Sequence, residues 1–152
     1  MSRTRSQRTM AMRRALAAGL VIAAGAACAA KKAAVSVADL RCENRERLTG
    51  ADTKHPVFSW TLTSTGRSQT QTAWRVQVAR SAAGLETGSG RIWDSGRRTG
   101  EAEAFAVYDG PELEAGSEYA WRVRIWDGLG RPADWSPAST FITGLVRPAD
   151  WS

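Results

Sequence analysis

The chain has little of the chemistry on which most active sites depend. Of its 152 residues, one is a histidine (His55) and two are cysteines (Cys28 and Cys42). A single histidine cannot supply a histidine metal cluster, and no histidine-assisted serine or cysteine triad can be assembled convincingly around it. The two cysteines imply no disulfide framework, and the glycines form no phosphate-binding motif. We therefore expect no metal site and no cofactor.

The excess of positive charge is confined to the N-terminus. The formal net charge is +6, but residues 1–32 hold seven basic side chains and no acidic one. The remaining residues hold 14 basic and 15 acidic side chains, which leaves the folding part of the chain close to neutral. Binding of a phosphate backbone needs Lys and Arg clustered on the folded part. We therefore expect no nucleic-acid partner.

Residues 1–29 have the order of a secretory signal peptide. A basic segment, Met1–Arg14, precedes an apolar run from Ala15 to Ala27. This run is shorter than the ~20 residues that span a hydrocarbon core, so a cleaved signal is favoured over a permanent anchor. The sequence predicts an exported protein, periplasmic or extracellular.

The two cysteines have different expected roles. Cys28 follows Gly25-Ala26-Ala27, which resembles a lipobox, although the position of Gly25 is usually Leu. Acylation of Cys28 and ordinary cleavage at an Ala-x-Ala site both remain open, and a lipid anchor would be the only membrane contact. Cys42 is expected to be a small buried apolar residue beside the first strand.

Residues 34–144 show the alternation of short half-buried strands, with no sustained helical periodicity. The connections at Arg45–His55 and Gly84–Gly90 are expected to be irregular. The fold class is therefore all-β, a seven-stranded antiparallel sandwich. Strands are predicted at Val35–Cys42, 58–63, Thr72–Arg80, 92–96, Ala104–Tyr108, 119–126 and Ser139–Thr143. The inner faces of the sandwich are predicted to contain Phe58, Trp60, Leu62, Trp74, Val76, Val78, Tyr119, Trp121, Val123 and Phe141.

One segment predicts how the chain crosses between the two sheets. Leu113, Gly116 and Tyr119 follow one another at offsets of three, directly before the strand that holds Trp121. This spacing is typical of a tyrosine corner, in which the ring packs inside and the hydroxyl bonds a backbone group. Gly116 would supply the backbone freedom that the corner needs.

Several tryptophans are candidates for contacts with partners. Trp93 and Trp135 are expected at strand ends, Trp126 on the face opposite Trp121, and Trp151 near the C-terminus. Three roles remain open for them: contacts with neighbouring modules, packing within the module, and stacking on a sugar ring.

Six motifs in register resemble one family. They are Leu40-Arg41-Cys42-Glu43, Pro56-Val57-Phe58-Ser59-Trp60, Gln71-Thr72-Ala73-Trp74, Ile92-Trp93-Asp94-Ser95-Gly96, Trp121-Arg122-Val123-Arg124-Ile125-Trp126-Asp127, and Asp134-Trp135-Ser136 with Phe141-Ile142-Thr143-Gly144. In this order, they are similar to the N-terminal fibronectin-type-III-like, immunoglobulin-like module of bacterial α-L-rhamnosidases of glycoside hydrolase family 78. The similarity covers residues 37–152, although the family more often has Tyr at the position of Trp74.

The resemblance implies an ancillary module rather than an enzyme. It implies that terminal α-L-rhamnose is hydrolysed with inversion by carboxylic acids in a downstream (α/α)6 barrel, none of which can be assigned to this chain. We therefore expect no catalytic residue here, and the downstream domains of the same polypeptide as partners, with rhamnose-containing glycans as a further candidate. The alternatives are a stand-alone exported sandwich that binds glycan or protein at the cell surface, and a gene remnant.

The C-terminal segment 145–152 is interpreted as the start of a linker to a further module. Arg131-Pro132-Ala133-Asp134-Trp135-Ser136 recurs as Arg147-Pro148-Ala149-Asp150-Trp151-Ser152. The second copy follows the last predicted strand, so we expect the chain to be the first part of a longer polypeptide.

Overall fold

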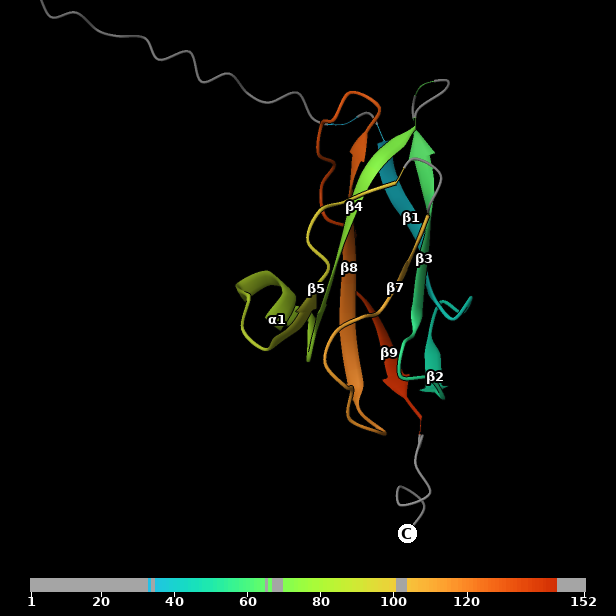
Figure 1. Cartoon of the computed structure of the whole chain (residues 1–152), viewed down its shortest axis with the longest axis vertical. Coiled ribbons are helices and arrows are strands. Elements are labelled where there is room, and N and C mark those ends of the chain that lie inside the picture. The colour runs from blue at the N-terminus through green and yellow to red at the C-terminus, as the bar shows by residue number, and fades with distance from the viewer. Residues whose placement is uncertain (1–32, 34, 65, 67–69, 101–103, 145–152) are drawn as a thin grey trace, which may run out of the picture.

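The computed structural model describes residues 33, 35–64, 66, 70–100 and 104–144. Two β-sheets pack face to face (Figure 1). The smaller sheet has the order β1 (Val35–Cys42), β3 (Val57–Ser64), β7 (Phe105–Val107). The larger sheet has the order β2 (Leu48–Ala51), β9 (Ser139–Thr143), β8 (Glu118–Asp127), β4 (Gln71–Ala79), β5 (Arg91–Asp94), and β6 (Arg98–Thr99) also pairs with β4.

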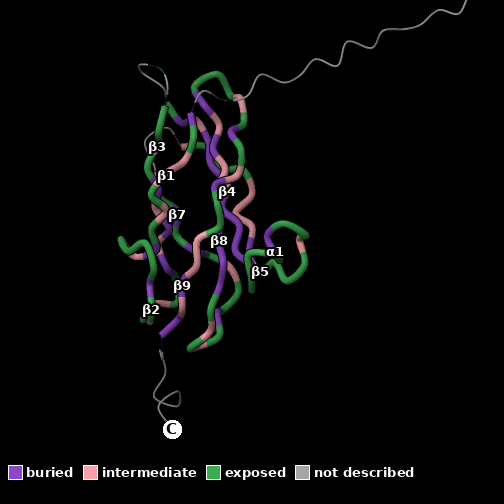
Figure 2. Tube along the Cα trace, turned by 180° about the vertical axis from the view of Figure 1, so that it is seen from behind, coloured by how far each residue is buried: buried purple, intermediate pink, exposed green. Residues whose placement is uncertain are grey.

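The register between β4 and β8 places the apolar residues of both strands on the same face. Val76 lies opposite Val123, and Val78 lies opposite Trp121, all four buried. Directly opposed residues of an antiparallel pair share a face, so this register gathers the apolar half of each strand against the smaller sheet. Figure 2 shows the buried residues concentrated along the strands of the two layers. The predicted inner faces are confirmed, except that Leu62 is only partly buried.

Phe58 connects the two sheets through aromatic contacts. Its ring centroid, in β3, lies 4.6 Å from that of Trp121, 5.4 Å from Phe141 and 6.5 Å from Trp93. All three partners belong to the larger sheet, and Phe58 itself is fully buried. Rings at these separations gain more than their buried area alone provides.

Two strands and a helix lie where the sequence predicted irregular connections or turns. β2 occupies part of Arg45–His55 and pairs with β9 in parallel. The predicted β-sandwich is confirmed, with two short strands more than predicted and one parallel pair among the antiparallel ones. Only Leu48 and Ala51 of β2 are buried, and four residues are too few to show clear alternation. β6 has two residues, both exposed, and gives no pattern.

The short helix α1 (Ala82–Thr87) replaces most of the loop predicted at Gly84–Gly90. The Ser81 hydroxyl accepts a hydrogen bond from the Gly84 N–H (3.1 Å), and Gly88 ends the helix with φ +77°. These are the usual residues for the two ends of a helix. Six residues cannot display a helical period, and the apolar contact of the helix with the sheet is that of Leu85 with Ala79 and Ala120.

The segment before β8 forms the corner that its spacing predicted. The Tyr119 ring is 1% exposed, and its hydroxyl accepts a hydrogen bond from the Glu114 N–H at 2.9 Å. Leu113 is buried, and Gly116 has φ +64°, a conformation that favours glycine. A comparable contact that the sequence analysis missed is the hydrogen bond from the Tyr108 hydroxyl to the Pro111 carbonyl (2.6 Å).

We predict that Tyr119→Phe lowers the free energy of unfolding by about 1 kcal/mol, because the part-buried hydrogen bond from the Glu114 N–H loses its acceptor while the ring still packs. Denaturant unfolding of the variant and the parent chain measures the difference. An unchanged midpoint would show that the hydroxyl contributes nothing to stability.

Candidate interaction surfaces

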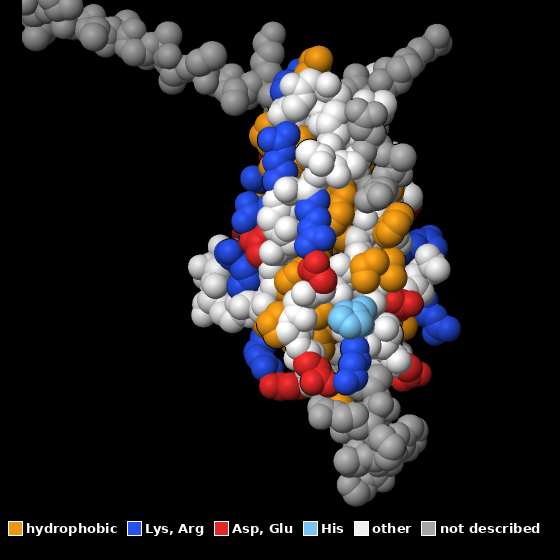
Figure 3. Space-filling view, in the orientation of Figure 1, with side chains coloured by type: hydrophobic (Ala, Val, Ile, Leu, Met, Phe, Trp, Pro, Cys, Tyr) orange, Lys and Arg blue, Asp and Glu red, His pale blue; other side chains and the backbone are white. Residues whose placement is uncertain are grey.

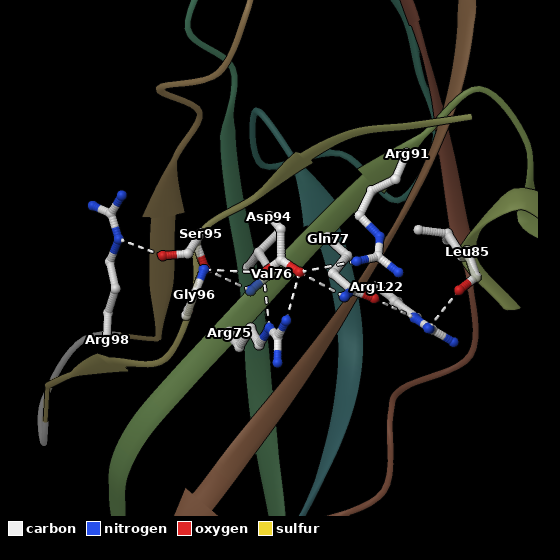
Figure 4. A network of polar contacts seen from close by, with 10 residues as sticks. All are labelled: Arg75, Val76, Gln77, Leu85, Arg91, Asp94, Ser95, Gly96, Arg98 and Arg122. Carbon is white, nitrogen blue, oxygen red and sulfur yellow. Dashed lines mark hydrogen bonds and ion pairs between the residues drawn. The ribbon is translucent and has the colours of Figure 1, made fainter. Parts of the chain in front are cut away.

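The outer face of the larger sheet carries a polar network built by strand register (Figure 4). Gln77 of β4 lies between Asp94 of β5 and Arg122 of β8. Arg75 and Arg124 form the next opposed pair along β4 and β8. Because the inner residues alternate with these, all five side chains must point away from the core.

Asp94 is the centre of this network. Its carboxylate accepts two hydrogen bonds from Arg75 (2.8 and 2.6 Å), one from the Gln77 amide (2.8 Å) and one from the Gly96 N–H (3.0 Å). Partial burial alone would raise the pKa of Asp94, but the hydrogen bonds from Arg75, Gln77 and Gly96 and the charge of Arg75 lower it to about 2. The carboxylate is therefore fixed as an anion that holds β4 and β5 together.

Arg122 connects the network to helix α1. Its buried guanidinium donates to the Gln77 side chain (3.1 Å), the Leu85 carbonyl (2.6 Å) and the exposed carboxylate of Glu86 (2.9 Å). A buried guanidinium needs such partners to offset its lost hydration. The role of Arg122 is therefore to fasten α1 onto the sheet.

Trp135 packs against the arginines of the same face. The Cζ atoms of Arg122, Arg124 and Arg75 lie 4.5, 4.8 and 6.0 Å from the centroid of its ring. The segment around it is held along β8 by the Ser136 N–H, which donates to the Val123 carbonyl (2.8 Å). Cation–π contacts of this kind stabilise both the ring and the guanidinium groups. The structure thus gives Trp135 contacts within the module.

The other tryptophans proposed as partner contacts differ from one another. Trp93 is 8% exposed and packs against Tyr108 and Phe58, so its contacts in the structure lie within the module, one of the three roles left open. The reason is register, because Trp93 lies opposite the inward-facing Val78. Trp126 is on the outer face and only partly exposed, with the Cζ of Arg97 4.8 Å from its ring centroid. Trp151 and the lipidation candidate Cys28 lie outside the described residues.

Several acidic residues of the described chain are used in ion pairs. Glu112 pairs with Lys54 (3.1 Å), and Glu114 pairs with Arg80 (2.6 Å), all four largely exposed. The Arg80 hydrogen bond and charge lower the pKa of Glu114. An inverting glycosidase instead needs an acid whose pKa is raised, facing a second carboxylate across a pocket.

The described residues offer little else for catalysis. No three His, Cys, Asp or Glu side chains among them converge as metal ligands. The His55 ring nitrogen Nδ1 lies 2.9 Å from the Tyr108 carbonyl oxygen. Cys42 is buried, and its burial and the neighbouring charge of Glu43 raise the pKa of its thiol to about 12. An open hollow of about 680 Å³ is lined by Asp39, Leu40, Glu46, Arg47, Ala138, Ser139 and Thr140, with no aromatic ring to stack on a sugar.

One surface feature was not predicted from the sequence. Phe105 and Val107 of β7 are each 46% exposed, while Ala106 between them is buried opposite Phe58. The alternation of this strand was visible in the sequence. The usual assignment of the larger residues to the core would have given the wrong face.

No helix in the described part of the chain has both the length and the apolar character to span a bilayer.

We predict that the pH dependence of stability reports the Asp94 network. Its folded pKa of about 2 lies below the ordinary value of 3.8, so the stabilisation is complete above about pH 4 and is lost as the pH falls toward 2. Between pH 5 and 2, the parent chain should lose about 1–2 kcal/mol more than Asp94→Asn does. Glu114→Gln, which alters an exposed pair, should behave like the parent. Equal losses of stability in the parent chain, Asp94→Asn and Glu114→Gln would show that a group other than Asp94 causes the pH dependence.

Comparison with known proteins identifies this sandwich as an immunoglobulin-like domain. The family model described as the Rha78A-like, N-terminal immunoglobulin domain matches residues 37–147. The chain therefore belongs to this family, and the resemblance stated from its motifs is confirmed.

The similar proteins are much longer than this chain. The α-L-rhamnosidase of Streptomyces avermitilis is 37% identical over 111 residues, which cover 73% of this chain and 11% of that protein. An α-L-rhamnosidase of Formosa agariphila is 30% identical over 93 residues, 61% of this chain and 10% of the relative. The chain thus spans about a tenth of the length of these curated relatives.

Two solved structures have the same fold at similar identity. The α-L-rhamnosidase from Dictyoglumus thermophilum matches with a TM-score of 0.73 and 36% identity, covering 77% of this chain and 13% of that one. The Streptomyces avermitilis α-L-rhamnosidase complexed with L-rhamnose matches with a TM-score of 0.73 and 37% identity, covering 78% of this chain and 11% of that one.

Proposed function

We propose that this chain is the non-catalytic N-terminal module of a secreted α-L-rhamnosidase, and that it supports and positions the domains that follow. The observation that carries this proposal is the family match over residues 37–147, together with the small share of each rhamnosidase relative that the match covers. The hydrolysis of terminal α-L-rhamnose would be performed by the rest of the polypeptide.

The end of β9 is held firmly enough to fix the direction of a following segment. The Gly144 N–H donates to the Ala51 carbonyl (2.9 Å), and the Thr143 N–H donates to the Ser117 carbonyl (3.0 Å). The Thr143 hydroxyl also donates to the Glu114 carbonyl (2.5 Å). Both β2 and the tyrosine corner therefore hold this end of the sandwich. A domain joined here would start from a rigid base, which suits a positioning role.

Three carboxyl groups of the described residues support a non-catalytic assignment. The pKa of Asp127, like those of Asp94 and Glu114, is lowered; burial alone would raise it, but hydrogen bonds from Arg131 and Leu129 prevail. Carboxyl groups held in this way favour the anion and are poor general acids at neutral pH.

We predict that the purified 152-residue chain does not hydrolyse an aryl α-L-rhamnoside, whereas the product of the continuous reading frame beyond codon 152 does. Release of the aryl alcohol, compared with a buffer blank, measures both. Turnover by the 152-residue chain would overturn the proposal that the catalytic residues lie in the rest of the polypeptide. A frame that closes after Ser152 and continues into an unrelated gene would overturn the ancillary role and favour a stand-alone binding protein.

We also propose that residues 1–29 direct export of the protein and that the mature chain begins near Cys28. The basic segment, the short apolar run and the small residues before Cys28 support this proposal. The N-terminal peptide of the protein secreted by its native host should lack Met1, and a lipid-sized mass on Cys28 would distinguish acylation from simple cleavage. An intact N-terminus beginning at Met1 in the exported protein would contradict the assignment.

A further inference from the structure

The outer face of the smaller sheet carries an apolar patch, which consists of Val57, Phe105 and Val107. Val57 and Val107 are directly opposed across β3 and β7, and Phe105 lies two residues along the same strand, so all three side chains share a face. Phe105 and Val107 are two of the three large hydrophobic residues that are exposed in the described chain. Figure 3 shows hydrophobic surface directly above the single histidine, His55, which lies two residues before Val57.

Two exposed ion pairs involve residues that lie close in sequence to this apolar patch. Lys54 and Glu112 form an exposed pair at 3.1 Å, and Arg98 and Asp109 form another at 2.6 Å. Asp109 lies two residues after Val107, and Lys54 lies three residues before Val57. An apolar centre with a polar rim is the usual anatomy of a protein–protein interface.

The edge of β7 is open as well. Within the described residues, β7 pairs only with β3. The Tyr108 N–H donates to the carbonyl of Pro56, directly before β3, and the Trp60 N–H of β3 donates to the Ala104 carbonyl. By antiparallel alternation, the backbone groups of Phe105 and Val107 point away from β3, toward the open edge. An uncovered apolar edge strand is a liability in a free module and is commonly covered by another element.

The patch lies in the half of the sandwich from which the chain leaves, because Phe58, opposite Ala106, packs on Trp121 near the start of β8. Ala51 of β2 pairs with Thr143 of β9, and only five residues separate Ala51 from Val57. β8 begins beside this end, where Glu118 lies opposite Ile142, so the turn that contains Leu129 lies at the other end (Figure 1). A domain tethered at Gly144 would be present at high effective concentration beside the patch, and not beside Leu129.

We propose that the apolar patch of Val57, Phe105 and Val107 is the docking surface for the domains that follow this module in the same polypeptide. This inference rests on the proposed function, because the occupant is the part of the rhamnosidase that lies beyond residue 152. The relatives, of which the matched region is 10–13%, have ample chain to cover the patch. Phe105 is the central contact.

Hydroxyl-radical labelling read by peptide mass spectrometry tests the proposal without altering the protein. Oxidation of Phe105 should fall several-fold in the product of the full reading frame relative to the 152-residue chain. Leu129, 77% exposed at the opposite end, is the internal control and should be oxidised equally in both. In the full-length protein, Phe105→Ser with Val107→Ser should then lower the unfolding temperature, whereas Leu129→Ser should leave it unchanged.

The other outcomes distinguish failure of the docking surface from failure of the proposed function. Equal oxidation of Phe105 in an active full-length rhamnosidase would overturn the docking surface and leave the proposed function standing. Protection of Phe105 in the 152-residue chain that increases with its concentration would show a second copy as occupant. Protection that appears only with a rhamnose oligosaccharide would show a glycan surface. Either result would overturn the inference. A frame that ends at Ser152 would remove the proposed function, and the inference with it.

Discussion

The contact between Phe58 and Trp121 is the constraint on which the structure depends. A sheet with one apolar face cannot remain in water alone, and a sheet of three strands must cover that face with the larger sheet. Phe58 gives that sheet a cross-layer contact at 4.6 Å from Trp121, with Phe141 next to it. Tyr119 packs on Phe141 from the other side, at 5.6 Å, so the corner and the cross-sheet contact stabilise each other.

The outer face of the larger sheet follows from the same register. Once Val76, Val78, Val123 and Trp121 face the core, the alternating residues must face outward, and these are mostly arginines and Gln77. Asp94 and Trp135 then supply the anion and the ring that these side chains contact. The polar side chains on the outer face of the larger sheet thus hold β4, β5, β8 and helix α1 together. Among the strands that the structure describes, the exposed large apolar side chains lie instead on β7, at Phe105 and Val107.

Long alternating segments made the fold predictable from the sequence. β4 and β8 have nine and ten residues, and their alternation identified both strands and their inner faces. The corner was predictable because Gly116 and Tyr119 have restricted roles at that spacing. The parallel pairing of β2 was not predictable, because it depends on β9, which lies some ninety residues away in the sequence. The family was identified from six motifs in the same order and spacing, and no single strand would have been sufficient.

The candidate surfaces were harder to predict, for reasons of register and geometry. Whether a tryptophan is exposed depends on the partner strand: Trp93 is inside because it lies opposite Val78. Trp135 lies on the arginines because its segment returns along β8, and nothing local in the sequence indicates that path. Phe105 is outside because Ala106 is the residue opposite Phe58. Only the three-dimensional pairing decides each case.

Equilibrium unfolding of Phe58→Ala in the 152-residue chain tests most directly whether this cross-sheet contact closes the module. The account predicts a cooperative transition for the parent chain and a loss of about 3–5 kcal/mol in the variant. A loss below about 1 kcal/mol, the range of substitutions away from the core, would contradict it, because the two sheets would then be held together by something else.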